Sequence, residues 1–287
     1  MQGGGGGGVI RLLAAAALVA AVPAPAPEPQ PLVIGETVTL EVLGAAREIN
    51  IVLPPDYAKD PAKRWPVIYQ LDGDIRQDLM MGTGLMRWNA LWGRSEDAIL
   101  VGIATKDRQR ELLPTTQDPA EAKRYPTAGE SAAFRAWLAD TVKPLVESRY
   151  RTDGRAFLVG ESAAGHFVVE TWEETPQLFT GYAAISPSLQ WDFEALSRRP
   201  LGTAPRPPLY ISLADEGGAT ESGMERLLAT LPPSQPFCFS DRRKELHHAT
   251  TLHGLFPEAL QYLMPTQADW LTEYGMVLRC ERRGYGV

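Results

Sequence analysis

The sequence predicts an α/β fold in which a mostly parallel central sheet is covered by helices on both faces. After residue 32, short apolar runs alternate with helical patterns along the chain. Such alternation is typical of parallel strands joined by crossover helices. The 287 residues are enough for one large α/β domain, and neither a repeat nor a linker interrupts residues 32–287. We therefore predict a single domain over that range.

The predicted strands fall into two kinds. Residues 38–43 and 48–53 alternate apolar and polar side chains, which is typical of half-buried antiparallel strands. The other runs are mostly apolar and short, as buried strands are. They span residues 66–71, 98–104, 156–159, 182–185, 209–213 and 237–240.

The predicted helices separate these strands. Residues 131–150 carry apolar side chains on one helical face, and Pro144 is expected to interrupt or kink that helix. The apolar residues between Leu79 and Trp92 fit either a pocket rim or an amphipathic helix that packs inward. Further helices are expected at residues 163–173, 224–231, 257–263 and 267–277.

Composition and charge exclude several classes of protein. With 44% apolar and 22% charged residues, the chain is neither wholly disordered nor a multi-span membrane protein. Its net charge of -7 and its pI near 5.3 argue against a nucleic-acid partner, because polyphosphate backbones are bound by a basic stripe.

Residues 1–31 differ from the rest of the chain. One arginine, Arg11, precedes an apolar run from Leu12 to Val22, and an Ala/Pro tract follows it. This order is typical of a secretory signal peptide, and the run is shorter than the about 20 residues of a membrane span. We expect export to the periplasm or outside the cell, without stable membrane insertion once the leader is cleaved. A leader with no targeting role would leave the protein in the cytoplasm.

Whether the two cysteines form a disulfide depends on the compartment in which the protein lies. Cys238 and Cys280 can form one disulfide if the protein is exported, because oxidising compartments permit it. Two buried free thiols are the alternative, and the sequence leaves both open.

The segment around Ser162 carries the clearest chemical signal. A buried strand, residues 156–159, leads directly into Gly160-Glu161-Ser162, and a helix follows at Ala163. A nucleophilic serine needs such a turn, which lifts its hydroxyl off the sheet beside a helix N-terminus. A helix N-cap serine is the structural alternative.

Acid and base candidates follow the serine in chain order, as α/β-hydrolase chemistry requires. His166 is too close to Ser162 to return as its base, which leaves His247, His248 and His253. Asp215 and Glu216 follow the strand at residues 209–213, where a carboxylate can orient an imidazole.

Two further features complete the predicted site. The turn Gln70–Asp74 is a candidate for the second oxyanion donor, with backbone N–H groups near Gly73 and at Ala163. The histidine spacing matches no common metal site, so we expect no metal and no organic cofactor.

Several stretches resemble the putative-esterase branch of the α/β-hydrolases, which includes siderophore esterases and relatives of the S-formylglutathione hydrolases. The resemblance covers about residues 35–265. Its matching stretches are Pro54–Tyr57, Trp65–Gly73, Val101–Ile103, Asp107–Thr115, Val142–Thr152, Gly160–Ser162 and Ile185–Asp192.

The resemblance implies roles for individual residues. Ser162 would be the nucleophile and His248 the base, and the acid would be Glu216, with Asp215 in reserve. Substrate contacts are expected from Asp74, Arg108 and Trp191, and Arg110 lies in the same loop as Arg108.

One departure concerns the elbow itself. The family pattern is His-Ser-x-Gly-Gly, whereas Glu161 precedes the nucleophile here and Ala164 replaces the first glycine. The Glu161 carboxylate would either alter the substrate charge preference or point to solvent.

The resulting hypothesis is a serine carboxylic-ester hydrolase that acts on a small ester, such as a siderophore, through an acyl-enzyme. An acyltransferase with the same triad and a catalytically silent hydrolase-fold binding protein are the alternatives.

Overall fold

The computed structural model describes residues 1–8, 28–202, 204 and 206–284. The chain divides into two units, Met1–Val33 and Ile34–Val287. The described residues of the first unit form no helix or strand. The predicted apolar leader, Leu12 to Val22, lies outside the described residues, and the predicted boundary after residue 31 stays a prediction. None of the helices in the described ranges is long and apolar enough to cross a membrane.

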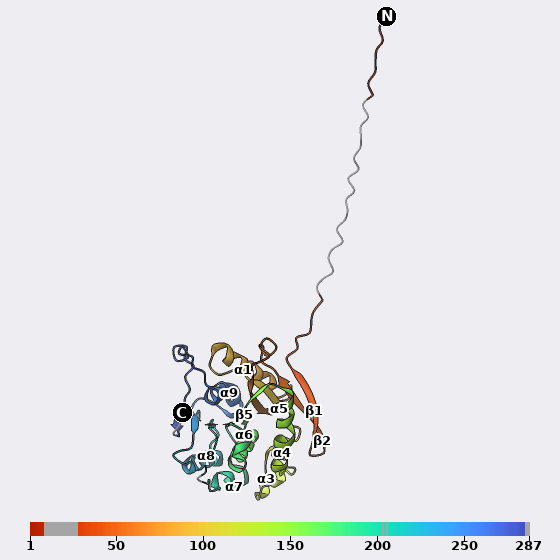
Figure 1. The fold of residues 1–287 in the computed structure, drawn as a ribbon. Coiled ribbons are helices and arrows are strands. Elements are labelled where there is room, and N and C mark those ends of the chain that lie inside the picture. The colour runs from red at the N-terminus through yellow and green to blue at the C-terminus, as the bar shows by residue number, and fades with distance from the viewer. Residues whose placement is uncertain (9–27, 203, 205, 285–287) are drawn as a thin grey trace. The chain divides into compact units, whose positions relative to one another are not determined.

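The second unit is built on a nine-stranded sheet with the order β1-β2-β4-β3-β5-β6-β7-β8-β9. Figure 1 shows β1 and β2, in orange, side by side at one edge of this unit. The six central strands, β4, β3, β5, β6, β7 and β8, are parallel. The outer strands β1, β2 and β9 pair antiparallel with their neighbours. The predicted mostly parallel sheet is confirmed. The strands are β1 (Glu36–Val42), β2 (Ala45–Val52), β3 (Trp65–Leu71), β4 (Ile99–Ile103), β5 (Thr152–Glu161), β6 (Gly181–Ile185), β7 (Leu209–Leu213), β8 (Phe237–Asp241) and β9 (Arg282–Arg283).

Helices cover both faces of the sheet, also as predicted. One face packs against α1 and α9, and the other against α4, α5, α6 and α8. The strands alternate between these two cores: Phe157 and Val159 of β5 face α1 and α9, whereas Leu158 faces α6. The helices are α1 (Leu79–Trp92), α2 (Arg108–Leu112), α3 (Pro119–Arg124), α4 (Ser131–Trp137), α5 (Lys143–Arg149), α6 (Ala163–Glu174), α7 (Trp191–Glu194), α8 (Gly218–Thr230) and α9 (Thr251–Leu263).

Pro144 affects its helix as the sequence predicts. A π-helical segment, Leu138–Val142, separates α4 from α5, and Pro144 stands at the start of α5. A proline ring clashes with the carbonyl four residues earlier and cannot donate a hydrogen bond to it. The wider π turn before Pro144 accommodates the ring without ending the helical path.

The predicted helix over residues 267–277 is wrong. This segment consists of turns, and Gly275 has a φ of 72°. Its aromatic side chains dock on the end of α1 instead: Trp270 donates its indole N–H to Trp92 O at 3.0 Å, and the Tyr274 ring lies 5.7 Å from the Trp92 ring. Tertiary contacts therefore override the helical pattern.

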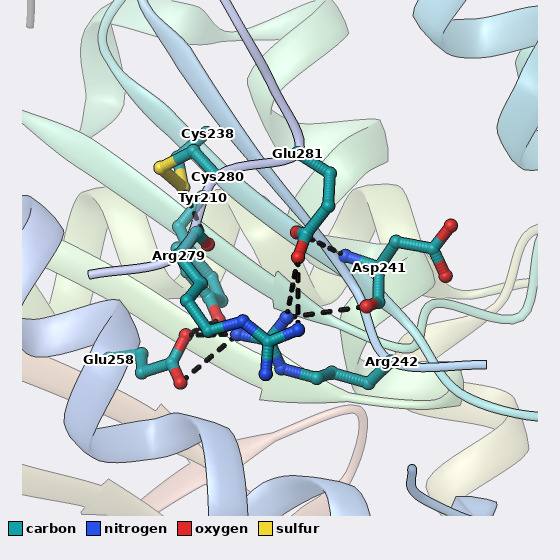
Figure 2. Close-up of a disulfide and its surroundings, with 8 residues drawn as sticks. All are labelled: Tyr210, Cys238, Asp241, Arg242, Glu258, Arg279, Cys280 and Glu281. Carbon is teal, nitrogen blue, oxygen red and sulfur yellow. Dashed lines mark hydrogen bonds and ion pairs between the residues drawn. A yellow bond between two sulfur atoms is a disulfide. The ribbon is translucent and has the colours of Figure 1, made fainter. Parts of the chain in front are cut away.

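A disulfide holds the segment after these turns to the edge of the sheet. Cys238 of β8 is bonded to Cys280, and the two-residue strand β9 continues the pairing along β8. This decides the open cysteine question in favour of the disulfide. Figure 2 shows the buried Arg242 beside it, with ion pairs to Glu258 of α9 at 2.8 Å and to Glu281 at 3.0 Å. The C-terminal segment, β8 and α9 are thus joined at one edge.

We expect the Cys238→Ala/Cys280→Ala double variant to lose about 2–4 kcal/mol of unfolding free energy. The disulfide joins residues 42 positions apart, and such a cross-link removes conformational entropy from the unfolded chain. Urea unfolding followed by circular dichroism measures the difference, and reduced wild type should show the same loss. An unchanged free energy would mean that the Arg242 ion pairs and β9 hold this edge without the disulfide.

Candidate active site

Ser162 occupies a one-residue turn between β5 and α6. Its backbone is at φ 61° and ψ −120°, a conformation rarely adopted by residues other than glycine. The turn is crowded, because a Cβ at Gly160 would lie 2.7 Å from the backbone of Ala164. The Ser162 N–H donates to Ile185 O of β6, and the first helical hydrogen bond of α6 is accepted by Ser162 O. The hydroxyl is thereby presented at the N-terminus of α6.

Glu216 and His248 meet at the same edge of the sheet. Glu216 follows β7, His248 begins the 3-10 turn η4 (His248–Thr250) after β8, and His248 Nδ1 lies 2.5 Å from Glu216 Oε1. A carboxylate only accepts, so Nδ1 carries the proton and Nε2 is left with its lone pair. Ser186 Oγ donates to the same Glu216 oxygen at 2.5 Å.

The pairing shifts both pKa values in opposite directions. Burial alone raises the pKa of Glu216, but the hydrogen bonds from His248 and Ser186 outweigh it and hold the pKa below its ordinary value. The hydrogen bond to Glu216 raises the pKa of His248 above 6.5, against the smaller opposing effect of burial. Both shifts favour the ionised pair.

The other predicted acid and bases lie elsewhere. Asp215 is exposed and lies 3.6 Å from the exposed His247, and His253 stands on an exposed face of α9. His166 is buried in α6, where its Nδ1–H donates to Ser188 O at 2.9 Å. Burial lowers the pKa of His166, which keeps it neutral. Of the candidate acids and histidines, the geometry brings together Glu216 and His248.

The Ser162 hydroxyl has a second serine beside it. Its Oγ lies 3.4 Å from Ser188 Oγ, and the Ser188 N–H donates to Ser162 O at 3.0 Å. Within the described ranges, no hydrogen bond joins Ser162 to His248. Such bonds are often long in unliganded enzymes and shorten when substrate binds.

The two predicted oxyanion donors differ in their availability. The Ala163 N–H lies in the first turn of α6, where amides have no intrahelical acceptor. The Gly73 N–H, by contrast, donates to Ile103 O of β4 at 2.8 Å. A second donor from this turn therefore has to be another amide, such as that of Asp74, whose present bond to Gln77 Oε1 is 3.2 Å long.

Of the predicted substrate contacts, Arg108 and Trp191 lie next to the Ser162 turn. Arg108 bridges two turns: its Nε lies 2.8 Å from Asp72 Oδ2, and its Nη2 donates to Glu161 O at 2.9 Å. Asp74 is partly exposed and accepts from the N–H of Arg76, and it lines a cavity of about 470 Å³.

Trp191 is buried next to the nucleophile turn. It packs with Leu113 and Ala163, and its indole N–H donates to Pro114 O at 3.1 Å. Together with His166 it lines a cavity of about 230 Å³. Arg110, in contrast, faces Glu130 at 3.8 Å.

Sequence reasoning missed two residues of this network, Ser186 and Ser188. Ser186 donates to Glu216, and Ser188 lies beside the Ser162 hydroxyl. Both stand in the Ser-Pro-Ser stretch after β6, a position that marks them as neighbours of the Ser162 turn. Glu161 does not point to solvent: its carboxylate accepts from the Thr251 hydroxyl and from the Leu252 N–H at the start of α9. Among the described residues, no group of three or more His, Cys, Asp or Glu side chains could hold a metal ion.

Comparison with known proteins identifies relatives of this chain. The Bacillus subtilis (strain 168) ferri-bacillibactin esterase BesA is 27% identical over 165 residues, which cover 51% of this chain and 55% of that protein. The chain thus matches only about half the length of this curated relative.

Three solved structures share the fold. The BES protein from Bacillus cereus superposes with a TM-score of 0.68 at 18% identity, covering 83% of this chain and 99% of that one. An IroE-like serine hydrolase from Shewanella oneidensis has a TM-score of 0.68 at 23% identity, with 80% of each chain covered. The siderophore hydrolase EstB from Aspergillus nidulans has a TM-score of 0.67 at 18% identity, covering 83% of this chain and 97% of that one.

The family assignment rests on the sequence match. The family described as "putative esterase" matches residues 41–219, more than half of the chain and all of the elements from β2 to the loop after β7. The chain belongs to the putative esterase family of the α/β-hydrolases.

Proposed function

We propose that this protein is a serine carboxylic-ester hydrolase whose nucleophile, base and acid are Ser162, His248 and Glu216. The observation that carries the proposal is the combination of a strained serine turn at a helix N-terminus with a Glu216–His248 pair at the same sheet edge. Family membership and relatives named as esterases support the reaction class.

The proposed reaction proceeds through an acyl-enzyme. Ser162 Oγ attacks the ester carbonyl carbon while His248 Nε2 accepts the hydroxyl proton. The resulting oxyanion is stabilised by the Ala163 N–H and by a second amide of the turn at residues 72–74. When the tetrahedral intermediate collapses, His248 returns the proton to the departing alcohol. Water then attacks the acyl-enzyme with His248 again as base, and Ser162 regains its proton.

The acid and the serine beside it determine how the base is oriented. Glu216 keeps the Nδ1–H tautomer of His248 and stabilises the imidazolium that forms during attack. Ser186, which donates to the same carboxylate oxygen, fixes the orientation of that carboxylate.

We propose a small siderophore ester as the substrate class. BesA is named as a ferri-bacillibactin esterase and EstB as a siderophore hydrolase. Arg108 and Trp191 lie next to the Ser162 turn. They, together with Asp74 in the turn after β3, would contact the substrate. Hydrolysis of a ferric trilactone siderophore, followed by chromatography, should give a linear acid and outpace the turnover of simple acetate esters. An enzyme that prefers acetate esters would refute this substrate class.

We also propose that the protein acts outside the cytoplasm. The disulfide is of the kind that persists in oxidising compartments. It agrees with the secretory pattern of the leader, and the N-terminal sequence of protein recovered from periplasmic or culture fractions tests both export and cleavage.

The first prediction for this site concerns the nucleophile and the base. We expect a fluorophosphonate probe to label the wild type and to leave Ser162→Ala unlabelled. Turnover of p-nitrophenyl acetate should fall by about 10⁴-fold or more in Ser162→Ala and His248→Ala, because both groups act in one step. Asp215→Asn is the matched control and should retain activity.

The same assay distinguishes the alternatives. A folded wild type that is neither labelled nor active would be a hydrolase-fold binding protein. Labelled enzyme that forms a new ester with an added alcohol instead of free acid would be an acyltransferase.

The second prediction concerns pH. Because the His248 pKa is raised, its neutral form accumulates only above pH 6.5, and kcat/KM should rise with pH to a midpoint above that value. The ion pair stabilises the fold below 6.5, and this contribution disappears as the pH rises through the His248 pKa; at the acid end it disappears below 4.5 as Glu216 is protonated.

NMR titration of the His248 imidazole tests whether Glu216 causes its raised pKa. In Glu216→Gln the His248 midpoint should fall below that of the wild type, since the largest raising contact is removed. Asp215→Asn should leave it unchanged. A midpoint that moves in Asp215→Asn and not in Glu216→Gln would assign the acid to Asp215.

A further inference from the structure

Glu161 is the residue in which the elbow departs most from the family pattern, and its side chain has specific partners. It is the last residue of β5, directly before Ser162. Its Oε1 accepts the Thr251 hydroxyl and the Leu252 N–H, the latter at 3.0 Å. Both donors belong to the first turn of α9. The carboxylate beside the nucleophile is therefore bonded to the element that follows the His248 loop.

Glu161 provides a hydrogen-bond acceptor for the first turn of α9. Thr250, the residue before the helix, makes no capping hydrogen bond of its own. The first amides of a helix lack acceptors and carry partial positive charge, so a carboxylate is stabilising there. Glu161 supplies this acceptor from a position distant in sequence.

The contact continues to the histidine. The Thr251 hydroxyl also contacts His248 O, at 2.8 Å. A short path thus runs from Ser162 through its neighbour Glu161 to Thr251 and on to the backbone of His248. The path joins the two loops whose relative position decides whether base and nucleophile meet.

We propose that Glu161 is a positioning residue whose contact with Thr251 and the start of α9 holds His248 in register with Ser162. This inference rests on the proposed roles of Ser162 and His248. It assigns to the carboxylate a role in joining the β5 and η4 ends of the site, in place of a contact with substrate.

Charge adds a second effect on the same base. The negative charge of Glu161 raises the pKa of His248, in the same direction as the larger effect of Glu216, whereas Arg108 lowers it. These groups come from three different elements: the end of β5, the loop after β7, and α2. Glu161 therefore influences both the placement and the proton affinity of the imidazole.

Two substitutions separate placement from charge. In Glu161→Gln the remaining carbonyl oxygen can accept from both Thr251 and Leu252, so the contact is kept and the charge is lost. Glu161→Ala removes both. Thr251→Val removes the hydroxyl that bridges to His248, and Thr251→Ser keeps it as the matched control.

The experiment measures p-nitrophenyl acetate kinetics, the His248 NMR titration and thermal stability for each variant. Glu161→Gln should keep kcat within about threefold and lower the His248 midpoint. Glu161→Ala and Thr251→Val should each lower kcat by about tenfold or more with little change in KM, because small displacements of catalytic groups are costly. The double variant should be no worse than Glu161→Ala, since both changes break one path.

A control at another helix start excludes a purely structural role. Asp118 accepts from the Ala120 N–H at the start of α3. Asp118→Ala removes this cap and should lower the melting temperature without affecting kcat or the His248 midpoint. If Glu161→Ala alters only the melting temperature, or if its effects add to those of Thr251→Val, the positioning role is refuted. Wild-type activity that depends on Ser162 distinguishes that result from failure of the proposed function, in which the wild type itself would be inactive.

Discussion

The site depends on the single residue that connects β5 to α6. Because β5 ends at Glu161 and α6 begins at Ala163, the chain changes direction at Ser162 alone. A non-glycine residue in this conformation costs about 1–3 kcal/mol, which the surroundings must offset. Small residues make room for the turn, and hydrogen bonds from Ser162 to β6 and from Ser188 to Ser162 hold it. The backbone strain at Ser162 and the presentation of its hydroxyl at the N-terminus of α6 have the same origin.

The parallel sheet brings the partners of this turn to one edge. β5, β6, β7 and β8 are neighbours and run in the same direction, so the segments after them lie side by side. Ser186 after β6 links two of them, because its hydroxyl donates to Glu216 and accepts from the Ala214 N–H. Directly after β8, Arg242 joins α9 to the C-terminal segment that the disulfide anchors (Figure 2).

Negative charge concentrates around this edge. Burial, with Asp72 and Glu161 nearby, raises the pKa of Asp78 to about 6. Among the groups that act on Asp78 and on His248, Arg108 opposes the carboxylates in both cases. An acidic surrounding stabilises the protonated imidazole of His248 and so raises its pKa. It also gives the Arg108 guanidinium, bonded to Asp72, a structural role in addition to any contact with substrate.

Sequence patterns predicted the elements that local forces control. The alternation of buried strands and helices identified the parallel sheet, because burial on both faces requires continuous apolar runs. The Gly-x-Ser turn could also be predicted, because a continuous apolar run leads directly into it and a helical pattern follows. The pattern failed where contacts distant in sequence decide the structure. Residues 267–277 have helical periodicity, yet Trp270 and Tyr274 contact Trp92 at the end of α1. Shortly after them, the disulfide holds Cys280 to β8.

By itself, the sequence determined the fold class, the order of the strands along the chain and the candidate serine, acids and histidines of the site. Only the tertiary structure decided which members of that set meet. It pairs His248 with Glu216 and leaves Asp215 beside His247, it commits the Gly73 amide to β4, and it turns Glu161 toward α9. The physical reason is that neighbouring residues such as Asp215 and Glu216 have nearly the same local chemistry. Their separation depends on the direction in which each backbone position points once the strands have aligned.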